Sequence, residues 1–372
     1  MHDQQRLSEI AHARQAMLHE GQSATDALVQ LWFDRAWLLP SWQRCLARGQ
    51  RPEQAVGFDL VPAAARQRAQ DEHHALLQAA RAPLQRLARM VAPIRYFALL
   101  TDAAGQVIDT AGAIDHHDPR AHAIARVGVD LSERCIGTSA IGAALAEQQP
   151  VWLHRGEHFF RDTSVYSCAG APVTGPDGRC LGMIDLTGID APERPELKHL
   201  LARSAREVED ALALAVPHRL RLRLAWSHSP TDDGADALLC LNADGAVVSA
   251  NAAARAMLPE LHALAGRAVH ADELFALPCA LLFDQAGHDA PLQVPLWSGL
   301  RLAVRAQWAA GTAGTSAARP LRQRETELIH QAVRDAHGNV AQAARALGLS
   351  RATVYRRLST PQGAGGDGGR QE

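Results

Sequence analysis

Four side chains near the end of the chain have the chemistry and the spacing that suit contact with DNA. They fall in a short basic stretch: Arg351, Thr353, Arg356 and Arg357. Ser350 is a typical helix-capping residue, and in a helix that starts there these four share the outward face while Val354 and Leu358 point inward. An arginine can pair with two acceptor atoms of guanine or clamp a phosphate, and serine or threonine hydroxyls reach phosphates at a helix start. The pattern predicts a DNA-binding helix.

Two further short helices are predicted to support this one. The first begins near Leu321 and ends at His337-Gly338, and the second is capped by Asn339 and ends at Gly348-Leu349. The second helix has a stripe of small apolar residues that allows close helix crossing: Val340, Ala343, Ala344 and Leu347. A generic three-helix cap with a basic surface is the alternative. The agreement of turn, caps, small residues and charge favours the DNA-binding unit.

The string Gly338-Asn-Val-Ala-Gln-Ala-Ala-Arg-Ala-Leu-Gly348-Leu-Ser-Arg-Ala-Thr-Val-Tyr-Arg-Arg-Leu358 resembles a Fis-type helix-turn-helix. The resemblance implies a homodimer that reads two half-sites on double-stranded DNA. It also implies these contacts: Asn339 and Gln342 near phosphate, and Ser350, Arg351, Thr353 and Arg356 in the groove.

Charge is distributed unevenly along the chain. Residues 319–358 contain eight arginines and three acidic residues, so their net charge is +8 − 3 = +5, and the remainder sums to −2 − 5 = −7. A basic end on an acidic body suits a small DNA-binding module attached to sensor domains, although a merely solvated basic face gives the same asymmetry.

Composition and cysteine usage narrow the class of protein. With 47% hydrophobic and 21% charged residues, the chain is typical of a soluble protein of two or three domains. No apolar run reaches the roughly 18 residues of a membrane-spanning helix, and the first residues lack the apolar stretch of a secretory signal. The six cysteines are scattered, with no C-x-x-C pair: Cys45, Cys135, Cys168, Cys180, Cys240 and Cys279. We therefore expect a cytoplasmic protein with no membrane contact, no cofactor and no metal site.

Hydrophobic periodicity predicts helices over residues 6–46, 63–90 and 194–226. The last of these could pack on its own domain or pair with a second copy. Three strand–turn–strand patterns lie between and after the helices, around Gly105, Gly178 and Gly245, where glycine supplies the backbone conformation of a tight turn. Hairpins separated by helices favour an α+β fold with antiparallel sheets over a Rossmann-type parallel sheet.

Residues 28–216 resemble the N-terminal part of acetoin-catabolism-type activators, a group assigned to the sigma-54-dependent regulators. The matching pieces are Ser41-Trp-Gln-Arg-Cys45, Ser132-Glu133, Gly137-Thr-Ser-Ala-Ile-Gly142, Glu157-His158-Phe159, Ser167-Cys168-Ala-Gly-Ala-Pro172 and Leu181-Gly-Met-Ile-Asp-Leu186. The resemblance implies a GAF-type domain that binds a small-molecule effector. Ser139 and Tyr166 depart from the family, which more often has asparagine and tryptophan at those positions, and both changes bear on the ligand.

A GAF-type pocket lies against one face of an antiparallel sheet, lined by apolar groups with a few polar anchors. The candidate effector-binding residues are Ser139, Glu157, His158 and Cys168. For each anchor taken alone, a purely structural role is favoured over contact with the effector. Glu157 and His158 can brace a loop, and Cys168 can be a small core residue.

Residues 233–309 resemble a PAS domain more weakly, through Asn242–Arg255, Leu274-Phe275 and Gly299–Val304. The sequence gives no sign of haem or flavin, so a structural or dimerising role is expected. The expected order along the chain is an N-terminal helical segment (1–65), a GAF-like domain (66–216), a linker (217–232), a PAS-like domain (233–309), a linker (310–319), the helix-turn-helix (320–360) and a disordered tail (361–372).

The ATPase motor of the sigma-54 relatives is not predicted here. Its phosphate loop, G-x-x-x-x-G-K-[ST], needs a lysine, and the only lysine of the chain is Lys198, within a predicted helix and without a glycine loop. We therefore expect a non-enzymatic, ligand-responsive DNA-binding regulator, with RNA polymerase as a further candidate partner. Two rivals stay open: a thiol-based redox enzyme using Cys168 or Cys135, and a subunit that pairs with full-length relatives.

Overall fold

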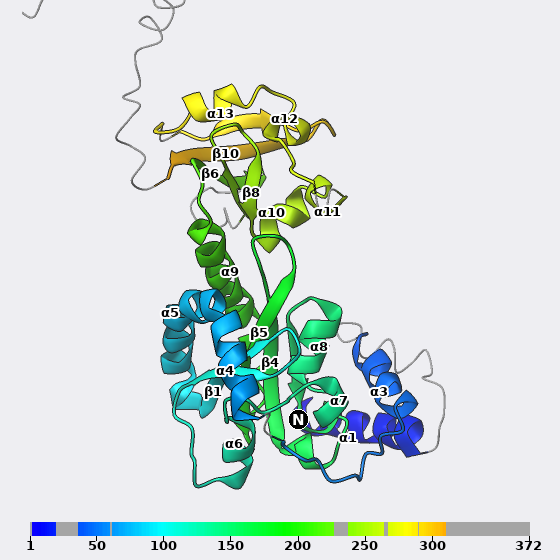
Figure 1. The fold of residues 1–372 in the computed structure, drawn as a ribbon. Coiled ribbons are helices and arrows are strands. Elements are labelled where there is room, and N and C mark those ends of the chain that lie inside the picture. Colours follow the sequence, from blue (N-terminus) through cyan, green and yellow to red (C-terminus); the bar gives the residue numbers. More distant parts are fainter. Residues whose placement is uncertain are drawn as a thin grey trace, which may run out of the picture. The chain divides into compact units, whose positions relative to one another are not determined.

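The computed structural model describes residues 2–19, 36–59, 62–226, 237–263, 267–288 and 290–309 (Figure 1). The chain divides into two compact units, Met1–Trp308 and Ala309–Glu372. The predicted helix-turn-helix, the linker before it and the tail lie outside the described residues. Among the helices that are described, none is both long and apolar enough to cross a bilayer.

The first half of the larger unit is built on a five-stranded antiparallel sheet, and we call residues 62–216 the first sheet domain. Its strands, in spatial order, are β2 (Val107–Ala111), β1 (Tyr96–Asp102), β5 (Cys180–Ile189), β4 (Tyr166–Thr174) and β3 (Val151–His154). The expected hairpins around Gly105 and Gly178 are therefore confirmed as β1–β2 and β4–β5.

Both faces of this sheet carry apolar side chains, because helices cover both faces. The helices are α4 (Ala63–Glu72), α5 (His74–Val91), α6 (Pro119–Ile124), α7 (Glu133–Ile136), α8 (Ala140–Glu147) and α9 (Leu197–Ala215), with a short turn η3 (Ala92–Ile94) after α5. Alternation along β1 shows the two faces, because Ala98 and Leu100 pack toward α5 and α9 while Phe97 and Leu99 pack into the opposite core. Helix α9 packs on its own domain through Leu201 and other buried residues.

Segments before the first sheet domain complete that opposite core. They are α1 (His2–Arg14), the π-helical turn η1 (Gln15–His19) and α3 (Leu38–Ala47). Ile10 and Met17 from the first two and Trp42 from α3 are buried, and they belong to the same core cluster as side chains of α7 and α8. Burying a side chain as large as Trp42 is worth roughly 1.5–3 kcal/mol, which fixes these segments on the domain.

A second five-stranded antiparallel sheet follows, and we call residues 217–309 the second sheet domain. In spatial order its strands are β8 (Val247–Ala250), β7 (Ala237–Leu241), β6 (Leu220–Trp226), β10 (Arg301–Trp308) and β9 (Leu292–Pro295). Four short helices accompany it: α10 (Ala252–Met257), α11 (Glu260–Ala263), α12 (Ala271–Leu274) and α13 (Ala280–Asp284). The expected hairpin around Gly245 is β7–β8.

Two sequence-based expectations are wrong between residues 194 and 232. The helix predicted over 194–226 ends at Ala215, and the segment predicted as linker from 217 begins with β6, the central strand of the second sheet. Pro217 cannot continue a helix, and Leu220, Leu222 and Leu224 alternate with arginines so that one side of the strand is buried.

Contacts of α9 join the two sheet domains. Glu209 is almost fully buried, and its carboxylate accepts hydrogen bonds from Thr174 N at 2.8 Å and from Ala252 N at 3.2 Å. Arg255 of α10 donates to the carbonyl of Pro176, in the β4–β5 turn, at 2.6 Å. The hairpin that carries β5 therefore touches the second sheet domain directly.

Candidate effector cavity

A small cavity lies in the core between the first sheet and helices α6–α8. Its volume is about 20 Å³, which exceeds the roughly 10–15 Å³ that a single water molecule requires. Its apolar walls include Leu99, Ile124 and Leu131. The polar side chains on its lining are Ser139, His158, Thr163, Tyr166, Cys168, Asp185 and Thr187.

Strand register brings three of these polar side chains together. Cys168 on β4 lies directly opposite Thr187 on β5, and Asp185 lies two residues before Thr187, so all three share one face of the sheet. The Cys168 Sγ is 3.3 Å from Thr187 Oγ1, and the threonine hydroxyl donates to Asp185 Oδ2 at 2.5 Å. The other carboxylate oxygen, Oδ1, is buried and has no hydrogen-bond partner among the described residues.

Burial sets the ionisation of Asp185. The residue is fully buried, and burial raises the pKa of its carboxyl to about 7, against the smaller opposing effect of the Thr187 hydrogen bond. Both the neutral and the ionised forms are therefore accessible near neutral pH. In its neutral form the group can donate as well as accept a hydrogen bond.

His158 brings a second unsatisfied polar atom to the cavity. Burial lowers the pKa of its imidazole to about 4, so the ring is neutral at physiological pH. Its Nδ1 lies 2.9 Å from the carbonyl oxygen of Arg155 and therefore carries the proton that it donates. The Nε2 atom is then a buried acceptor, without a hydrogen-bond partner in the described part of the chain.

Three other polar side chains on the lining have hydrogen-bond partners within the protein. Ser139 accepts a hydrogen bond from Gly142 N at 3.1 Å and caps helix α8. Thr163 donates to the carbonyl of Phe160 at 3.0 Å, and Tyr166 donates to the carbonyl of Arg120 at 3.1 Å. Asp185 Oδ1 and His158 Nε2 therefore remain as the two polar atoms available to a ligand.

An arginine of α1 holds the loop that carries His158. The largely buried Arg14 donates to the carbonyls of Gly156 at 2.8 Å and of Phe159 at 2.9 Å, and also to that of His158. Its guanidinium also lies 5.8 Å from the ring centre of Trp42. Charge-assisted hydrogen bonds to three carbonyl groups of this loop fix its backbone, and with it the imidazole position.

The candidate anchors predicted from sequence divide between the cavity and its support. Ser139, His158 and Cys168 line the cavity, whereas Glu157 does not. The Glu157 carboxylate accepts a hydrogen bond from His154 N at 2.6 Å and braces the turn η4 (Arg155–Glu157). Neither Asp185 nor Thr187 was among the anchors predicted from the sequence. An aspartate inside an apolar strand, Gly-Met-Ile-Asp-Leu, was the available signal.

Several motif residues from the sequence hold α3 on the domain. Glu133 accepts hydrogen bonds from Ser41 at 2.8 Å, from Arg44 at 2.9 and 2.8 Å and from Arg48 at 2.8 Å. Burial pushes the pKa of Glu133 upward, but the hydrogen bonds from Arg44, Ser41 and Arg48 outweigh burial and leave it below its ordinary value. Trp42 Nε1 donates to the carbonyl of Glu157 at 2.9 Å.

The thiols near the cavity are poor nucleophiles. Burial raises the pKa of Cys168 well above its usual range, and the nearby Asp185 adds to the effect. Burial and the hydrogen bond to Asp130 also raise the pKa of Cys135. Because the thiolate is the reactive form, these surroundings do not suit the redox enzyme considered above. The six cysteines are free, so no disulfide joins them.

The DNA-contacting residues predicted from sequence lie outside the described residues, so their contacts stay predictions. Among the described residues, one group of side chains lies close enough together to hold a metal ion, His270, Asp272 and Cys279, and it lies outside this cavity.

Comparisons with known proteins place the chain in a family. The profile described as "MimR, N-terminal domain" matches residues 8–210, more than half of the chain, and that of "Bacterial regulatory protein, Fis family" matches residues 320–359. The predicted Fis-type segment is thereby confirmed.

Three curated relatives are similar to more than half of this chain. The acetoin catabolism regulatory protein of Cupriavidus necator is 30% identical over 59% of this chain and 34% of its own length. The acetoin dehydrogenase operon transcriptional activator AcoR of Bacillus subtilis is 25% identical over 61% of this chain and 37% of its own length. The propane 2-monooxygenase operon transcriptional activator MimR of Mycolicibacterium smegmatis is 31% identical over 55% of this chain and 33% of its own length. The chain spans about a third of the length of these relatives. The resemblance to acetoin-catabolism-type regulators is confirmed, and the chain belongs to the MimR N-terminal domain family.

Proposed function

We propose that this protein is a transcriptional regulator whose DNA binding through residues 320–359 is modulated by a small molecule in the cavity of the first sheet domain. The observation that carries the proposal is the pairing of two features in one chain. One is a buried cavity with two unsatisfied polar atoms, His158 Nε2 and Asp185 Oδ1, and the other is a Fis-family segment. Its curated relatives are named as regulators and activators of catabolic operons.

The chemistry of the cavity selects the effector. A buried neutral imidazole offers an acceptor, so it favours a ligand hydroxyl that donates. Asp185 can accept from a hydroxyl when ionised and donate to a carbonyl when neutral. Placing an anion beside this buried carboxyl carries a large desolvation and repulsion cost. A small neutral alcohol or hydroxyketone therefore matches these polar groups best. Because the cavity measures about 20 Å³, room for about one water molecule, binding requires its apolar walls to move apart around the carbon atoms of the ligand.

A route from the cavity to the second sheet domain is present in the described contacts. Asp185 lies on β5, and the turn that leads into β5 contacts α10 through the Arg255 hydrogen bond to Pro176. A ligand that binds one arrangement of β4 and β5 more tightly shifts the population toward that arrangement. In the proposed mechanism the second sheet domain passes this shift to the DNA-binding segment of a homodimer.

The test measures DNA affinity of the full chain with and without effector. Duplexes are first selected from a random pool by the purified protein. Their affinity is then measured alone and with acetoin, isopropanol or propionate. We expect a neutral hydroxyl compound to change the DNA dissociation constant by roughly fivefold or more, a common size for coupling between sites, and propionate to have no effect.

Matched variants separate the two parts of the proposal. His158→Gln should lose the response to effector while keeping effector-free DNA binding, whereas His117→Gln, at an exposed position, should behave as wild type. Absence of any selected duplex contradicts DNA binding. DNA binding that no small neutral compound alters, or an unchanged response in His158→Gln, contradicts the cavity as the sensor.

The proposed regulator acts without its own ATPase. Lys198, the only lysine of the chain, lies in α9 and not in a phosphate-binding loop. Contact with RNA polymerase or pairing with a longer relative is therefore the proposed way to influence transcription. Steady ATP hydrolysis by the purified chain with its selected DNA would contradict this part of the proposal.

A further inference from the structure

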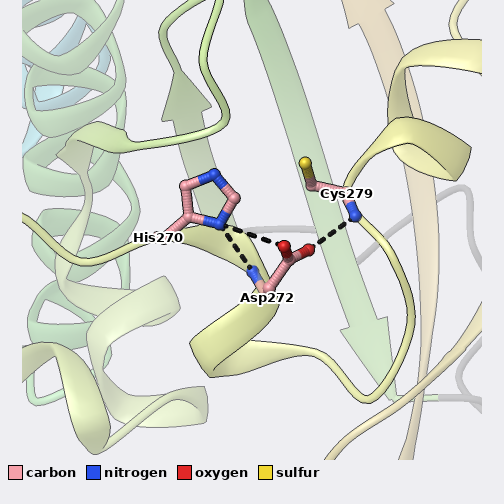
Figure 2. A group of neighbouring side chains, drawn as sticks. All are labelled: His270, Asp272 and Cys279. Atoms are coloured by element: carbon pink, nitrogen blue, oxygen red, sulfur yellow. Dashed lines mark hydrogen bonds and ion pairs between the residues drawn. The ribbon is translucent and has the colours of Figure 1, made fainter.

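Three side chains of types that can bind metal ions lie together in the second sheet domain. Figure 2 shows His270, just before α12, beside Asp272 of α12 and Cys279, just before α13. One donor atom from each residue lies within 4.8 Å of the others. The group is partly exposed and belongs to a different sheet from the effector cavity.

The orientation of His270 leaves a ring nitrogen facing a carboxylate. Its Nε2 lies 2.6 Å from the carbonyl oxygen of Asp244, so Nε2 carries a proton and donates it. In the neutral ring, Nδ1 then holds a lone pair, and it lies 3.4 Å from Asp272 Oδ2. The hydrogen bond that Nδ1 accepts comes from the backbone N–H of Asp272 and is long, at 3.3 Å. Two acceptor atoms at this separation repel each other unless a cation lies between them.

The separation of those two atoms matches a shared metal ion. Zinc bonds to imidazole nitrogen and carboxylate oxygen at about 2.0–2.2 Å, so two ligands at a tetrahedral angle lie about 3.3–3.6 Å apart. The Nε2 hydrogen bond to a backbone carbonyl is the kind of outer contact that orients metal-binding histidines. Asp272 is oriented too, because its Oδ1 accepts from Cys279 N at 2.7 Å and leaves Oδ2 toward the histidine.

Gly245 makes room for the imidazole and the thiol together. It lies in the β7–β8 turn with a φ of +87°, and a Cβ atom at this position would lie 2.7 Å from His270 Nε2 and 3.0 Å from Cys279 Sγ. Any side chain at this position would displace the imidazole, and with it the Nε2 hydrogen bond to Asp244 that orients the ring, or the thiol. The turn, the segment before α12 and the segment before α13 therefore converge on one point.

We propose that His270 Nδ1, Asp272 Oδ2 and Cys279 Sγ bind a divalent zinc ion. Mixed nitrogen, oxygen and sulfur donors suit zinc, while a site for magnesium or calcium uses oxygen donors. Three protein ligands leave the fourth position to water or to a donor from another molecule. Bound zinc joins the start of α12 to the start of α13, while the His270 hydrogen bond to Asp244 links the site to the β7–β8 turn, and the metal stabilises the folded second sheet domain.

The experiment uses the purified full chain, stripped of metal with a chelator that is then removed. Cobalt(II), a spectroscopic substitute for zinc, is added in steps. We expect saturation at one equivalent, with near-ultraviolet absorption from a thiolate–cobalt bond that zinc then displaces. We also expect zinc to raise the melting temperature, because it binds the folded chain.

Variants assign the site to these residues. Cys279→Ser should abolish the thiolate–cobalt band, and His270→Gln should weaken cobalt binding by roughly tenfold or more. Cys180→Ser, which removes another partly buried thiol from the first sheet domain, should leave both unchanged. Circular dichroism of the metal-free variants checks that they fold. A wild-type chain that binds no cobalt, or a band that persists in Cys279→Ser, overturns the proposal in favour of a simple imidazolium–carboxylate pair.

Discussion

At the scale of single residues, the molecule keeps two polar groups in a core that would otherwise be apolar. Neither Asp185 Oδ1 nor His158 Nε2 has a partner in the described structure, and a buried polar atom left unpaired costs roughly 1–3 kcal/mol. A ligand that satisfies both recovers this cost on binding. The same groups therefore weaken the fold and provide the affinity of the proposed effector site.

The two groups change the free energy of unfolding in opposite directions as pH rises. The raised pKa of Asp185 means that the folded state binds the extra proton, so its contribution falls as pH rises from about 4 to about 7. The lowered pKa of His158 means that the unfolded state binds the extra proton. Its contribution is therefore lost as pH falls from about 6.5 to about 4.

Substitution of Asp185 separates these effects. We expect Asp185→Asn, which cannot ionise, to be more stable than wild type at pH 8 and to gain stability relative to wild type as pH rises from about 5 to about 7, because the opposing contribution of Asp185 is removed. Urea unfolding across this range measures the change. Asp109→Asn, at a half-buried position on β2, is the control, and a variant profile that parallels wild type would contradict the assignment.

At the scale of elements, the cavity depends on segments that come before the first sheet domain. Helix α1 holds the loop around His158 through Arg14, and α3 is held on α7 by the hydrogen bonds of Glu133. Motif residues such as Ser41 and Arg44 thus act through the packing of helices. The side chains of Arg14, Ser41, Arg44 and Glu133 do not line the effector cavity.

Removal of the Arg14 guanidinium tests the role of α1. We expect Arg14→Met, which keeps an apolar stem, to lose roughly 2–3 kcal/mol of unfolding free energy, since hydrogen bonds to a charged group are worth about 1.5–3 kcal/mol. Amide hydrogen exchange of residues 155–159 should accelerate, and effector affinity should fall. Arg203→Met, at an exposed position of α9, is the matched control, and unchanged exchange in Arg14→Met would refute the positioning role.

At the scale of the whole molecule, residues 319–358, which cover the Fis-family segment, and the rest of the chain carry opposite net charge. The basic residues 319–358 supply the attraction to phosphate, which weakens with salt, while base contacts supply sequence preference. The proposed regulator must therefore show both a strong salt dependence and a preferred duplex.

Arg351 should separate these two contributions. If it reads a base edge, as the helix-turn-helix resemblance implies, Arg351→Ala should weaken binding to the selected duplex by roughly 1–3 kcal/mol and relax base preference at one position. A uniform loss across all duplexes, with a salt slope lowered by about 1, would instead assign Arg351 to phosphate. Binding curves at several salt concentrations measure both quantities.

Local signals were enough to determine much of this protein from its sequence. Turn glycines and alternating strands predicted the three hairpins, and the spacing of small and basic residues predicted a DNA-binding helical unit, because turns and helix faces depend on neighbours along the chain. The resemblance of residues 338–358 to a known motif then identified the unit as Fis-type. The alternation of leucine and arginine in Leu220–Trp226 was also a strand signal. A helix stripe running up to Pro217 obscured it.

Only the tertiary structure decided which residues form the cavity. Asp185 and Thr187 come from one strand, Cys168 from the next and His158 from a loop held by α1, and register and helix packing bring them together. It also distinguished Glu157, which braces its own turn, from His158, which reaches the cavity. Burial and pairing depend on residues distant in sequence, so a residue's type alone cannot reveal whether its polar atoms are satisfied.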